Sequence, residues 1–373
     1  MPFENRFASD RLYHCAITFF LLFIAAAAAF NGFYDKWHFR EPGVNYAMPR
    51  ASFEAIIEGT ADRPYVYRQL LPALTNWIDS GIPAETKERL LSPHGYNLNF
   101  VLNKVIASPL AQNPVYGLRY RILYFLCFGF TLLAAIALYL ALKAAGNPQP
   151  VALITTIGFL LFMPWILSVG GYYYDFPELA FFALGFWIAQ RFQWWWLIPL
   201  VILATWNKES FLLSIPLFLP LLRQRLSLFM SVLATGILGL ASLAEYFYIH
   251  NRFRLNGGST VEIHFAQQFE FRHHLLRSLF DLDITYGLLT FSISSLLLLG
   301  FIAWTAWRGW PLLSKAHRQY ILLAFFINLP LFYLFGQAGE LRGFSMVYVG
   351  FTLLLAANIG QWLSKSPESQ AAG

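Results

Sequence analysis

The chain has 373 residues, of which 57% are hydrophobic, 18% aromatic and only 12% charged, with a net charge of +6 and a mean hydropathy of +0.51. Soluble globular domains carry about 25% charged residues, so this composition excludes an ordinary soluble protein. The basic residues are scattered among apolar runs, which argues against nucleic acid as the partner and suits a protein among anionic membrane lipids. The composition predicts an all-α polytopic membrane protein with a single integral membrane domain over 1–373.

Several apolar runs are long enough to cross a bilayer, which takes roughly 20 helical residues. The first run is longer than the roughly 7–15 apolar residues of a cleaved signal peptide, so we interpret it as an uncleaved anchor. We predict about ten transmembrane helices, over 12–32, 120–142, 151–171, 177–190, 194–207, 210–222, 226–248, 284–307, 319–336 and 344–363.

The stretch LATWNKESFLL, residues 203–213, decides the orientation of everything downstream of it. A single tilted helix over this stretch would invert the later spans, whereas a hairpin turning at Asn207–Glu209 would not. With the hairpin, every cytoplasmic turn contains Lys or Arg, as the positive-inside rule requires. The sequence therefore predicts a hairpin, both termini in the cytoplasm, and two long extracytoplasmic loops at about 33–119 and 249–283.

The two helices that precede the hairpin tip are short. Spans 177–190 and 194–207 have about 14 residues each, or roughly 21 Å at 1.5 Å per residue, against a hydrocarbon core of roughly 30 Å. Their outer ends are therefore expected below the membrane surface. Polar backbone at that depth is tolerated only inside protein or beside a water-filled cavity.

Loop one contains an amphipathic segment, YRQLLPALTNWI. Its apolar positions fall on one helical face, and they are Leu70, Leu71, Leu74, Trp77 and Ile78. Such a helix is expected to lie in the membrane interface with its polar face toward water. It would serve either as a passive anchor or as the wall of a lateral entry for an anionic headgroup, with Arg68 near its start.

Acidic and basic residues gather near the outer ends of the predicted spans. Ionisable residues at membrane depth mark functional sites by default. A cavity containing both signs of charge suits a phosphate-bearing ligand, bound directly or through Mg²⁺ or Mn²⁺, which prefer oxygen ligands such as Asp35 and Asp175. The candidate site residues are Asp35, Arg68, Asp175, Lys208, Glu209, Arg272, Glu340 and Arg342.

Each candidate also has a purely structural interpretation. Asp35 would sit in the headgroup region at the end of a span. Asp175 is a suitable helix N-cap two residues before Pro177, and the charges at the hairpin tip would form an ordinary turn. Glu340 and Arg342 would form a surface ion pair that contributes little to stability.

An acid after span 1, a long amphipathic first loop and a second acid in the next outer loop form a familiar arrangement. Together with YRQLLP, the D-x-P-E turn from Asp175 and the K-E-S element from Lys208, it resembles the C-type fold (GT-C) of glycosyltransferases that use polyprenyl-phosphate sugars. The resemblance implies that Asp35 is the first-loop catalytic acid and Asp175 the second outer acid. The chain departs from the family in two places. Lys36 follows Asp35 where the family often has a second acid, and after Leu363 there is only a short polar tail, where many family members carry a soluble extracytoplasmic domain.

The resemblance implies a protein of the bacterial inner (plasma) membrane that transfers a sugar from a lipid-linked phosphate donor on the extracytoplasmic face, with the acceptor unassigned. Asp35 would accept the proton of the acceptor hydroxyl, and Asp175, with a divalent cation, would act on the departing phosphate. Lys208, Arg68 or Arg342 would stabilise the developing charge. The alternatives are a transporter or flippase for a lipid-linked or anionic substrate, and an inactive GT-C-like scaffold.

Overall fold

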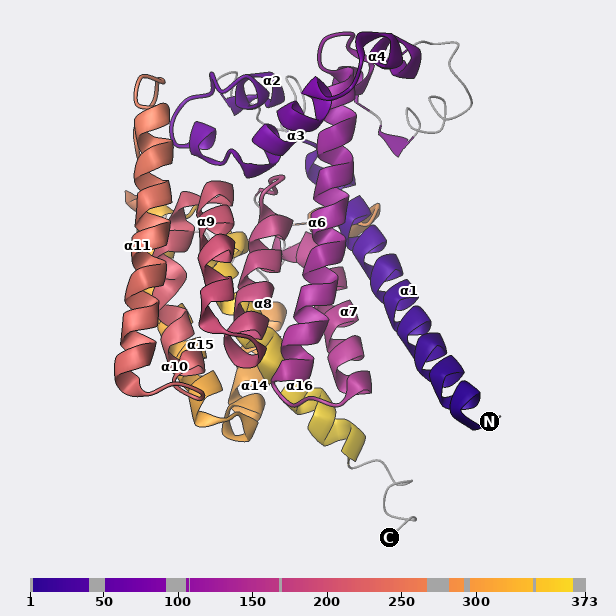
Figure 1. Ribbon diagram of the computed structural model, residues 1–373, viewed down its shortest axis with the longest axis vertical. Helices are drawn as coiled ribbons and strands as arrows, with labels where there is room; N and C mark the ends of the chain where they lie inside the picture. The colour runs from indigo at the N-terminus through magenta and orange to yellow at the C-terminus, as the bar shows by residue number, and fades with distance from the viewer. Residues whose placement is uncertain are drawn as a thin grey trace.

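The protein is a bundle of helices with a helical cap at one end, seen in a computed structural model (Figure 1). The structure describes residues 3–39, 51–91, 105–106, 108–167, 170–266, 282–291, 296–337 and 340–364. The cap contains α2 (Phe53–Ile57), α3 (Leu70–Ser80) and α4 (Ala84–Leu91). The start of α1 and the end of α16 lie at the opposite end of the bundle (Figure 1).

The bundle combines long helices with shorter ones. Its α-helices are α1 (Phe3–Trp37), α6 (Gly117–Ala144), α7 (Gln149–Ile166), α8 (Asp175–Arg191), α9 (Leu197–Asn207), α10 (Phe218–Leu222), α11 (Leu228–Arg252), α14 (Leu296–Gly309), α15 (Lys315–Phe335) and α16 (Tyr348–Ser364). Short 3-10 helices adjoin them: η2 (Tyr65–Tyr67), η3 (Pro109–Gln112), η4 (Trp194–Trp196), η5 (Glu209–Leu217), η6 (Trp310–Leu312) and η7 (Leu341–Val347).

Within the described residues, six helical segments are long and apolar enough to cross a membrane. They are Leu12–Trp37, Gly117–Ala144, Gln149–Ile166, Leu228–Arg252, Lys315–Phe335 and Leu341–Ser364. Each coincides with a predicted span, so a polytopic, membrane-embedded helical protein is supported. Two shorter apolar helical segments, Trp194–Asn207 and Glu209–Leu222, coincide with the arms of the predicted hairpin. The predicted total of ten transmembrane helices stays a prediction.

The chain reverses at the predicted hairpin tip. Lys208 has extended backbone angles (φ −156°, ψ 117°) that interrupt the helix. Before this break, Leu200 lies against Gly185 of α8, and after it Phe218 lies against the same glycine. Both arms therefore run alongside α8, as a hairpin requires and a continuous tilted helix does not allow.

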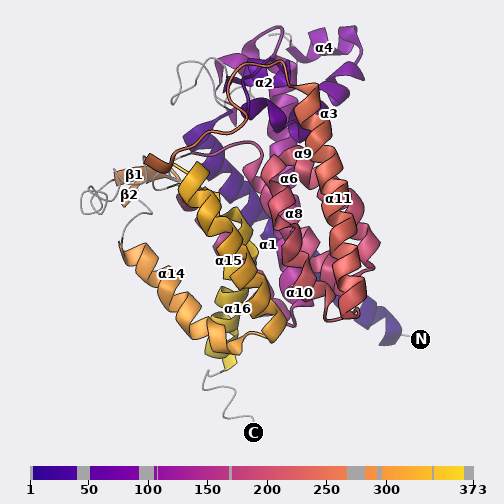
Figure 2. The ribbon, with the colours of Figure 1, turned by 90° about the vertical axis from the view of Figure 1, so that its left-hand side faces the viewer.

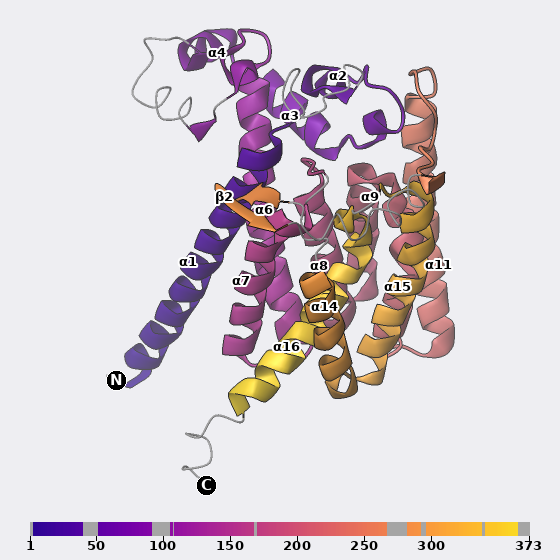
Figure 3. The ribbon, with the colours of Figure 1, turned by 180° about the vertical axis from the view of Figure 1, so that it is seen from behind.

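The prediction of a helix over 284–307 is wrong at its start. Strands β1 (Leu282–Thr285) and β2 (Leu288–Phe291) form an antiparallel pair there, with Thr285 opposite Leu288. The two turn residues, Tyr286 and Gly287, have positive φ values of 57° and 71°, the conformation of a tight two-residue hairpin turn. The pair contacts α1 (Figure 3), and the helix α14 begins only at Leu296.

Two predicted loop boundaries also shift, because helices continue past them. Helix α1 runs to Trp37, so Asp35 lies within a helix rather than in loop one. Helix α11 continues to Arg252, beyond the predicted start of the second outer loop at 249.

Small residues let the central helices approach closely. Helix α6 packs along α8, and Ala134, Ala135 and Ala141 of α6 and Ala180 and Ala183 of α8 are fully buried. Without a hydrophobic driving force inside a bilayer, such close packing is what holds helices together. Helix α11 packs on α9, and α14 packs on α16 at the opposite edge of the bundle (Figure 2).

The amphipathic helix predicted in loop one is present as α3. Leu70 and Leu71 are buried, and Leu74 packs partly against the core, whereas Trp77 is 73% exposed. The backbone N–H of Gln69, just before α3, donates to the carbonyl oxygen of Trp206 at 3.1 Å. Loop one is thereby attached to the end of α9, immediately beside the hairpin tip.

Candidate functional site

A cavity of about 420 Å³ lies where the cap meets the bundle. Its wall comes from segments far apart in the sequence: η2, the hairpin tip, the end of α11, residues 260–264, the end of α15 and η7. Five of the predicted site residues line it, namely Arg68, Lys208, Glu209, Glu340 and Arg342. A sixth, Asp175, lies 3.4 Å from Arg342. The structure thus brings together residues that the sequence analysis had placed only near the outer ends of the predicted spans.

Arg342 connects two acids. Its Nη1 lies 3.4 Å from Oδ1 of Asp175, and its Nη2 pairs with Oε1 of Glu340. The second oxygen of Glu340 accepts the backbone N–H of Gln337 at 2.8 Å. Burial raises the pKa of Glu340, but the adjacent guanidinium and this N–H outweigh burial and hold the pKa below its ordinary value. Arg342 is therefore held by Glu340, which directly precedes η7, and by Asp175 at the start of α8.

Lys208 is buried beside an acid that the sequence analysis did not select. Its Nζ donates to both carboxylate oxygens of Glu178, at 2.8 and 3.0 Å. Glu178 also accepts the hydroxyl of Ser345 at 2.8 Å, and its side chain is only 3% exposed. The partner of Lys208 is thus one turn into α8, rather than the adjacent Glu209.

Glu209 instead lies near Arg68. Nη2 of Arg68 is 3.6 Å from Oε1 of Glu209, and Nη1 donates to the hydroxyl of Tyr174 at 2.7 Å. The carbonyl oxygen of Arg68 accepts the hydroxyl of Tyr173 at 2.8 Å. Burial lowers the pKa of Arg68, but Tyr174 and Glu209 outweigh burial and raise it above its ordinary value. Arg68 therefore carries a fixed positive charge.

Two stacked tyrosines contact the arginines. The rings of Tyr172 and Tyr174 have centroids 5.0 Å apart and an interplanar angle of 17°. The guanidinium of Arg342 lies 4.0 Å from the centroid of Tyr172, and that of Arg68 lies 4.7 Å from the centroid of Tyr174. Such contacts between a guanidinium and an aromatic face are attractive and orient the planar group. The stack therefore fixes the spacing of two cations at the cavity.

Several polar atoms at this site are buried and have no hydrogen-bond partner among the described residues. They include Nε of Arg68, Nε of Arg342 and Oε2 of Glu209. Native proteins satisfy nearly all of their buried polar groups. Each of the two arginines therefore keeps hydrogen-bonding capacity that the described residues do not use.

The formal charges at the site almost cancel. Three bases, Arg68, Lys208 and Arg342, face four acids, Asp175, Glu178, Glu209 and Glu340, which leaves a formal charge of −1 when all are ionised. Each base has at least one acid within 4 Å, so the bases are held in place before any ligand arrives. A bound anion would share these cations with the carboxylates.

Asp35 lies outside the cavity lining. It is exposed on α1, while Phe33, two residues earlier, packs edge-to-face on Phe176 with a centroid separation of 5.6 Å. Helical residues two positions apart point about 200° apart, so Asp35 faces away from this contact with α8. The adjacent Lys36 pairs with Asp283 of β1. Arg272 lies outside the described residues.

The predicted Mg²⁺ or Mn²⁺ stays a prediction. Oδ2 of Asp175 accepts the backbone N–H of Tyr172 at 2.9 Å, and Oδ1 faces Arg342. Within the described ranges, His, Cys, Asp and Glu side chains form no group of three that is able to hold a metal ion. Both carboxylate oxygens of Asp175 therefore already have partners in the protein.

The structure adds residues that sequence reasoning missed. Glu178 carried a signal, because it belongs to the same D-x-P-E turn as Asp175. Nothing in the sequence pointed to Ser345 as a site residue. His250 also lines the cavity, stacked between Tyr67 and Tyr246 with centroid separations of 4.0 Å on each side. Its Nε2 is buried and has no partner among the described residues.

A scan against protein-family models found no match, and neither the curated proteins nor the solved structures contain a match to this chain. The function proposed below therefore rests on the residues of this cavity and on the resemblance carried by the sequence motifs.

Proposed function

We propose that the protein is a membrane glycosyltransferase that takes a sugar from a lipid-linked phosphate donor bound in this cavity. The observation that carries the proposal is that Arg68 and Arg342 lie on the two stacked tyrosines and both approach the hydroxyl of Tyr174, each with a buried Nε that has no partner among the described residues. Guanidinium groups recognise phosphate through several directed N–H bonds. The two arginines would donate to different oxygens of one phosphate.

The apolar part of the cavity wall suits the lipid part of such a donor. Among its lining residues are Leu212 and Leu213 of η5 and Leu331, Phe332 and Phe335 of α15. Leu213 and Phe335 are 44% and 39% exposed, so this wall continues onto the outside of the bundle. An isoprenoid chain packed there would remain in an apolar surrounding while its phosphate met the arginines.

The proposed reaction is a displacement with inversion at the anomeric carbon. The oxygen of an acceptor hydroxyl forms a bond to that carbon, and the bond from carbon to the phosphate oxygen breaks with its electron pair going to the phosphate. Arg68, Arg342 and Lys208 would stabilise the charge developing on that oxygen. Asp175 and Glu178 would act as positioning residues, because they hold Arg342 and Lys208.

The acceptor proton needs a base within the cavity. We assign Glu209, because it lines the cavity and its Oε2 is buried with no hydrogen-bond partner among the described residues. The sequence resemblance implies Asp35 instead, which is exposed on α1.

The position of the cavity favours an enzyme over a transporter or flippase. A carrier needs its polar site near mid-depth with access from both sides, whereas this cavity lies at the capped end of the bundle. An inactive scaffold would not need two arginines with free N–H groups. We further propose that the capped end is extracytoplasmic and that both termini face the cytoplasm of a bacterial cell, following the positive-inside rule.

Mass spectrometry of lipids that co-purify with the protein tests donor binding. We expect a lipid phosphate bearing a sugar to co-purify with the native protein and to be lost from Arg68→Gln and Arg342→Gln. Arg308→Gln, at the end of α14 outside this cavity, is the matched control and should keep the lipid. Retention of the lipid by both cavity variants would contradict the assignment, as would unchanged lipid-linked and surface glycans in cells lacking the protein.

A further inference from the structure

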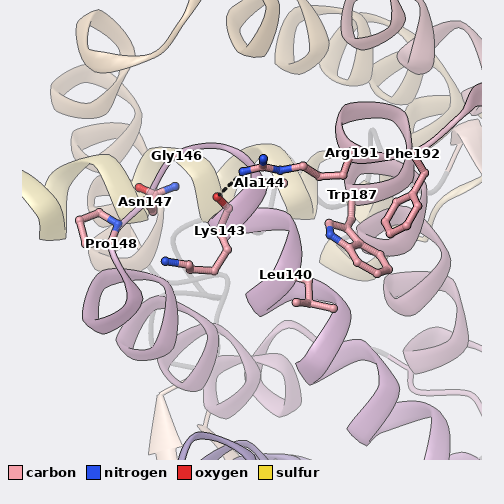
Figure 4. A pocket seen from close by; sticks show the side chains of 9 residues that line it. All are labelled: Leu140, Lys143, Ala144, Gly146, Asn147, Pro148, Trp187, Arg191 and Phe192. Atoms are coloured by element: carbon pink, nitrogen blue, oxygen red, sulfur yellow. Dashed lines mark hydrogen bonds between the residues drawn. The ribbon is translucent and has the colours of Figure 1, made fainter. Parts of the chain in front are cut away.

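A second cavity, of about 550 Å³, lies at the end of the bundle away from the cap. It is formed where α6 ends, where the turn to α7 begins and where α8 ends (Figure 4). Its lining residues are Leu140, Lys143, Ala144, Gly146, Asn147, Pro148, Trp187, Arg191 and Phe192. None of the predicted site residues takes part.

The charge at this cavity is entirely positive. Lys143 and Arg191 line it, and no lining residue is acidic. Nη2 of Arg191 lies 3.5 Å from the backbone carbonyl oxygen of Lys143 (Figure 4). Arg225 reaches the rim, where its Nη1 donates to the carbonyl oxygen of Phe192 at 2.6 Å. The segments 143–150, 187–196 and 222–228 contain no Asp or Glu.

The backbone adds a further attraction for an anion. Gly146, with a φ of 92°, ends α6 in a tight turn, and α7 begins three residues later at Gln149. The N-terminus of a helix carries a partial positive charge and N–H groups without helical partners. The start of α7, where Pro148 and Pro150 carry no N–H, therefore lies near Lys143 and adds mainly the partial charge of the helix end.

The remaining wall is apolar and aromatic. Leu140 and Trp187 line the cavity, and Trp187 packs edge-to-face on Phe192 with a centroid separation of 4.7 Å. Trp is enriched where the hydrocarbon of a membrane meets its headgroups. Helices α6 and α7 are both long and apolar enough to cross a membrane, so the turn joining them lies at a membrane surface.

We propose that this cavity binds the phosphate headgroup of an anionic phospholipid from the leaflet at that end of the bundle. Lys143 and Arg191 contact the phosphate, and the first acyl carbons lie against Leu140 and Trp187. Basic pockets between transmembrane helices bind anionic headgroups in this way. The alternative is that the two cations merely interact with the C-terminal ends of α6 and α8, which needs no ligand and predicts no lipid selectivity.

The test is thermal unfolding of the purified protein in neutral detergent with added lipid. We expect phosphatidylglycerol to raise the unfolding temperature more than phosphatidylcholine does, and the Lys143→Gln/Arg191→Gln variant to lose at least half of that difference. The matched control is Arg308→Gln/Lys315→Gln, which removes two charges near the end of α14 and the start of α15, outside this cavity, and should keep the difference. Inorganic phosphate at equal concentration should not reproduce the effect.

Three results would overturn the proposal: no difference between the two lipids with the native protein, equal losses in the cavity variant and its control, or an equal effect of inorganic phosphate. If the double variant does not fold, Arg191→Lys, which keeps the charge, and Lys143→Met are measured in its place. The difference in unfolding temperature between the two lipids should then persist in Arg191→Lys and shrink in Lys143→Met. Because the cavity lies apart from the site of sugar transfer, the outcome is independent of the proposed enzyme activity.

Discussion

The ammonium group of Lys208 lies 2.8 Å from one carboxylate oxygen of Glu178 and 3.0 Å from the other, with side-chain exposures of 15% and 3%. This buried pair joins the hairpin tip to the first turn of α8. Ser345 adds a third element, η7, through its hydrogen bond to Glu178. The charges that interrupt the apolar stretch at 203–213 therefore have a structural partner as well as a place at a cavity.

Removing one member of this pair should destabilise the protein strongly. In Lys208→Met the carboxylate of Glu178 stays buried without its partner, which costs about 3–5 kcal/mol. The Lys208→Met/Glu178→Gln variant leaves no uncompensated charge and should recover part of that loss. Unfolding of these two variants and of the Glu178→Gln single variant in a detergent titration, analysed with the native protein as a double-mutant cycle, measures the coupling. Additive losses would show that the two groups do not interact.

Arg342 should matter to sugar transfer as well as to folding, because Asp175 and Glu340 are buried and lose a partner without it. Arg342→Gln removes a donor to the departing phosphate, and loss of such a donor costs about 10²-fold or more in rate. Arg342→Lys keeps the charge but not the planar fork, so an intermediate rate is expected. The measurement is transfer from a lipid-linked sugar in proteoliposomes, with Arg308→Gln as the control and the elution profile as the check on folding. Native rates in both Arg342 variants would remove Arg342 from the site.

Glu209 and Asp35 are the two candidates for the general base. Loss of a general base costs about 10²–10⁴-fold in rate. The cavity geometry predicts that loss for Glu209→Gln, whereas the sequence resemblance predicts it for Asp35→Asn. Both substitutions keep the size of the side chain. Rates measured side by side decide between them, and a loss confined to Asp35→Asn would make the assignment of Glu209 wrong.

Gly185 should tolerate no side chain. A Cβ there would lie 2.7 Å from a ring carbon of Phe218, so α8 and the second arm of the hairpin would have to move apart. Overpacking of this kind costs about 1–3 kcal/mol. We expect Gly185→Ala to lower the unfolding temperature, and Gly236→Ala, where a Cβ meets nothing within 4 Å, to leave it unchanged or raise it. Equal behaviour of the two variants would contradict the close packing.

The orientation of the bundle is open to a labelling test. In a Cys15→Ser background, Leu255→Cys places a thiol beyond α11 near the cap, where Leu255 is 90% exposed. Gln224→Cys places one between α10 and α11 at the other end. In intact cells an impermeant thiol reagent should label only the Cys at 255, because only that thiol faces the outside in the proposed topology. Cys127 is buried and should give no background labelling. Labelling of the second alone would invert the proposed topology and move the sugar-transfer cavity to the cytoplasmic side.

The sequence predicted the helical elements well where the apolar pattern was long. Six predicted spans coincide with helices long enough to cross a membrane, and the charges of Lys208 and Glu209 located the hairpin turn. The prediction was wrong where the pattern was short: residues 284–291 are apolar enough for a helix but form the second half of β1, the turn at Tyr286–Gly287 and β2. Short apolar runs do not distinguish strand from helix.

By itself, the sequence determined that this is a helical membrane protein and which side of it collects the ionisable residues, because hydrophobic run length and charge distribution along the chain carry that information. Only the tertiary structure decided the partners: Glu178 rather than Glu209 for Lys208, and Asp175 together with Glu340 for Arg342. The first of these pairs joins residues 30 positions apart, and Asp175 and Arg342 are 167 positions apart. Such contacts depend on how each helix is rotated about its axis and how deep its end lies, and the packing of small residues such as Ala180 and Gly185 sets both.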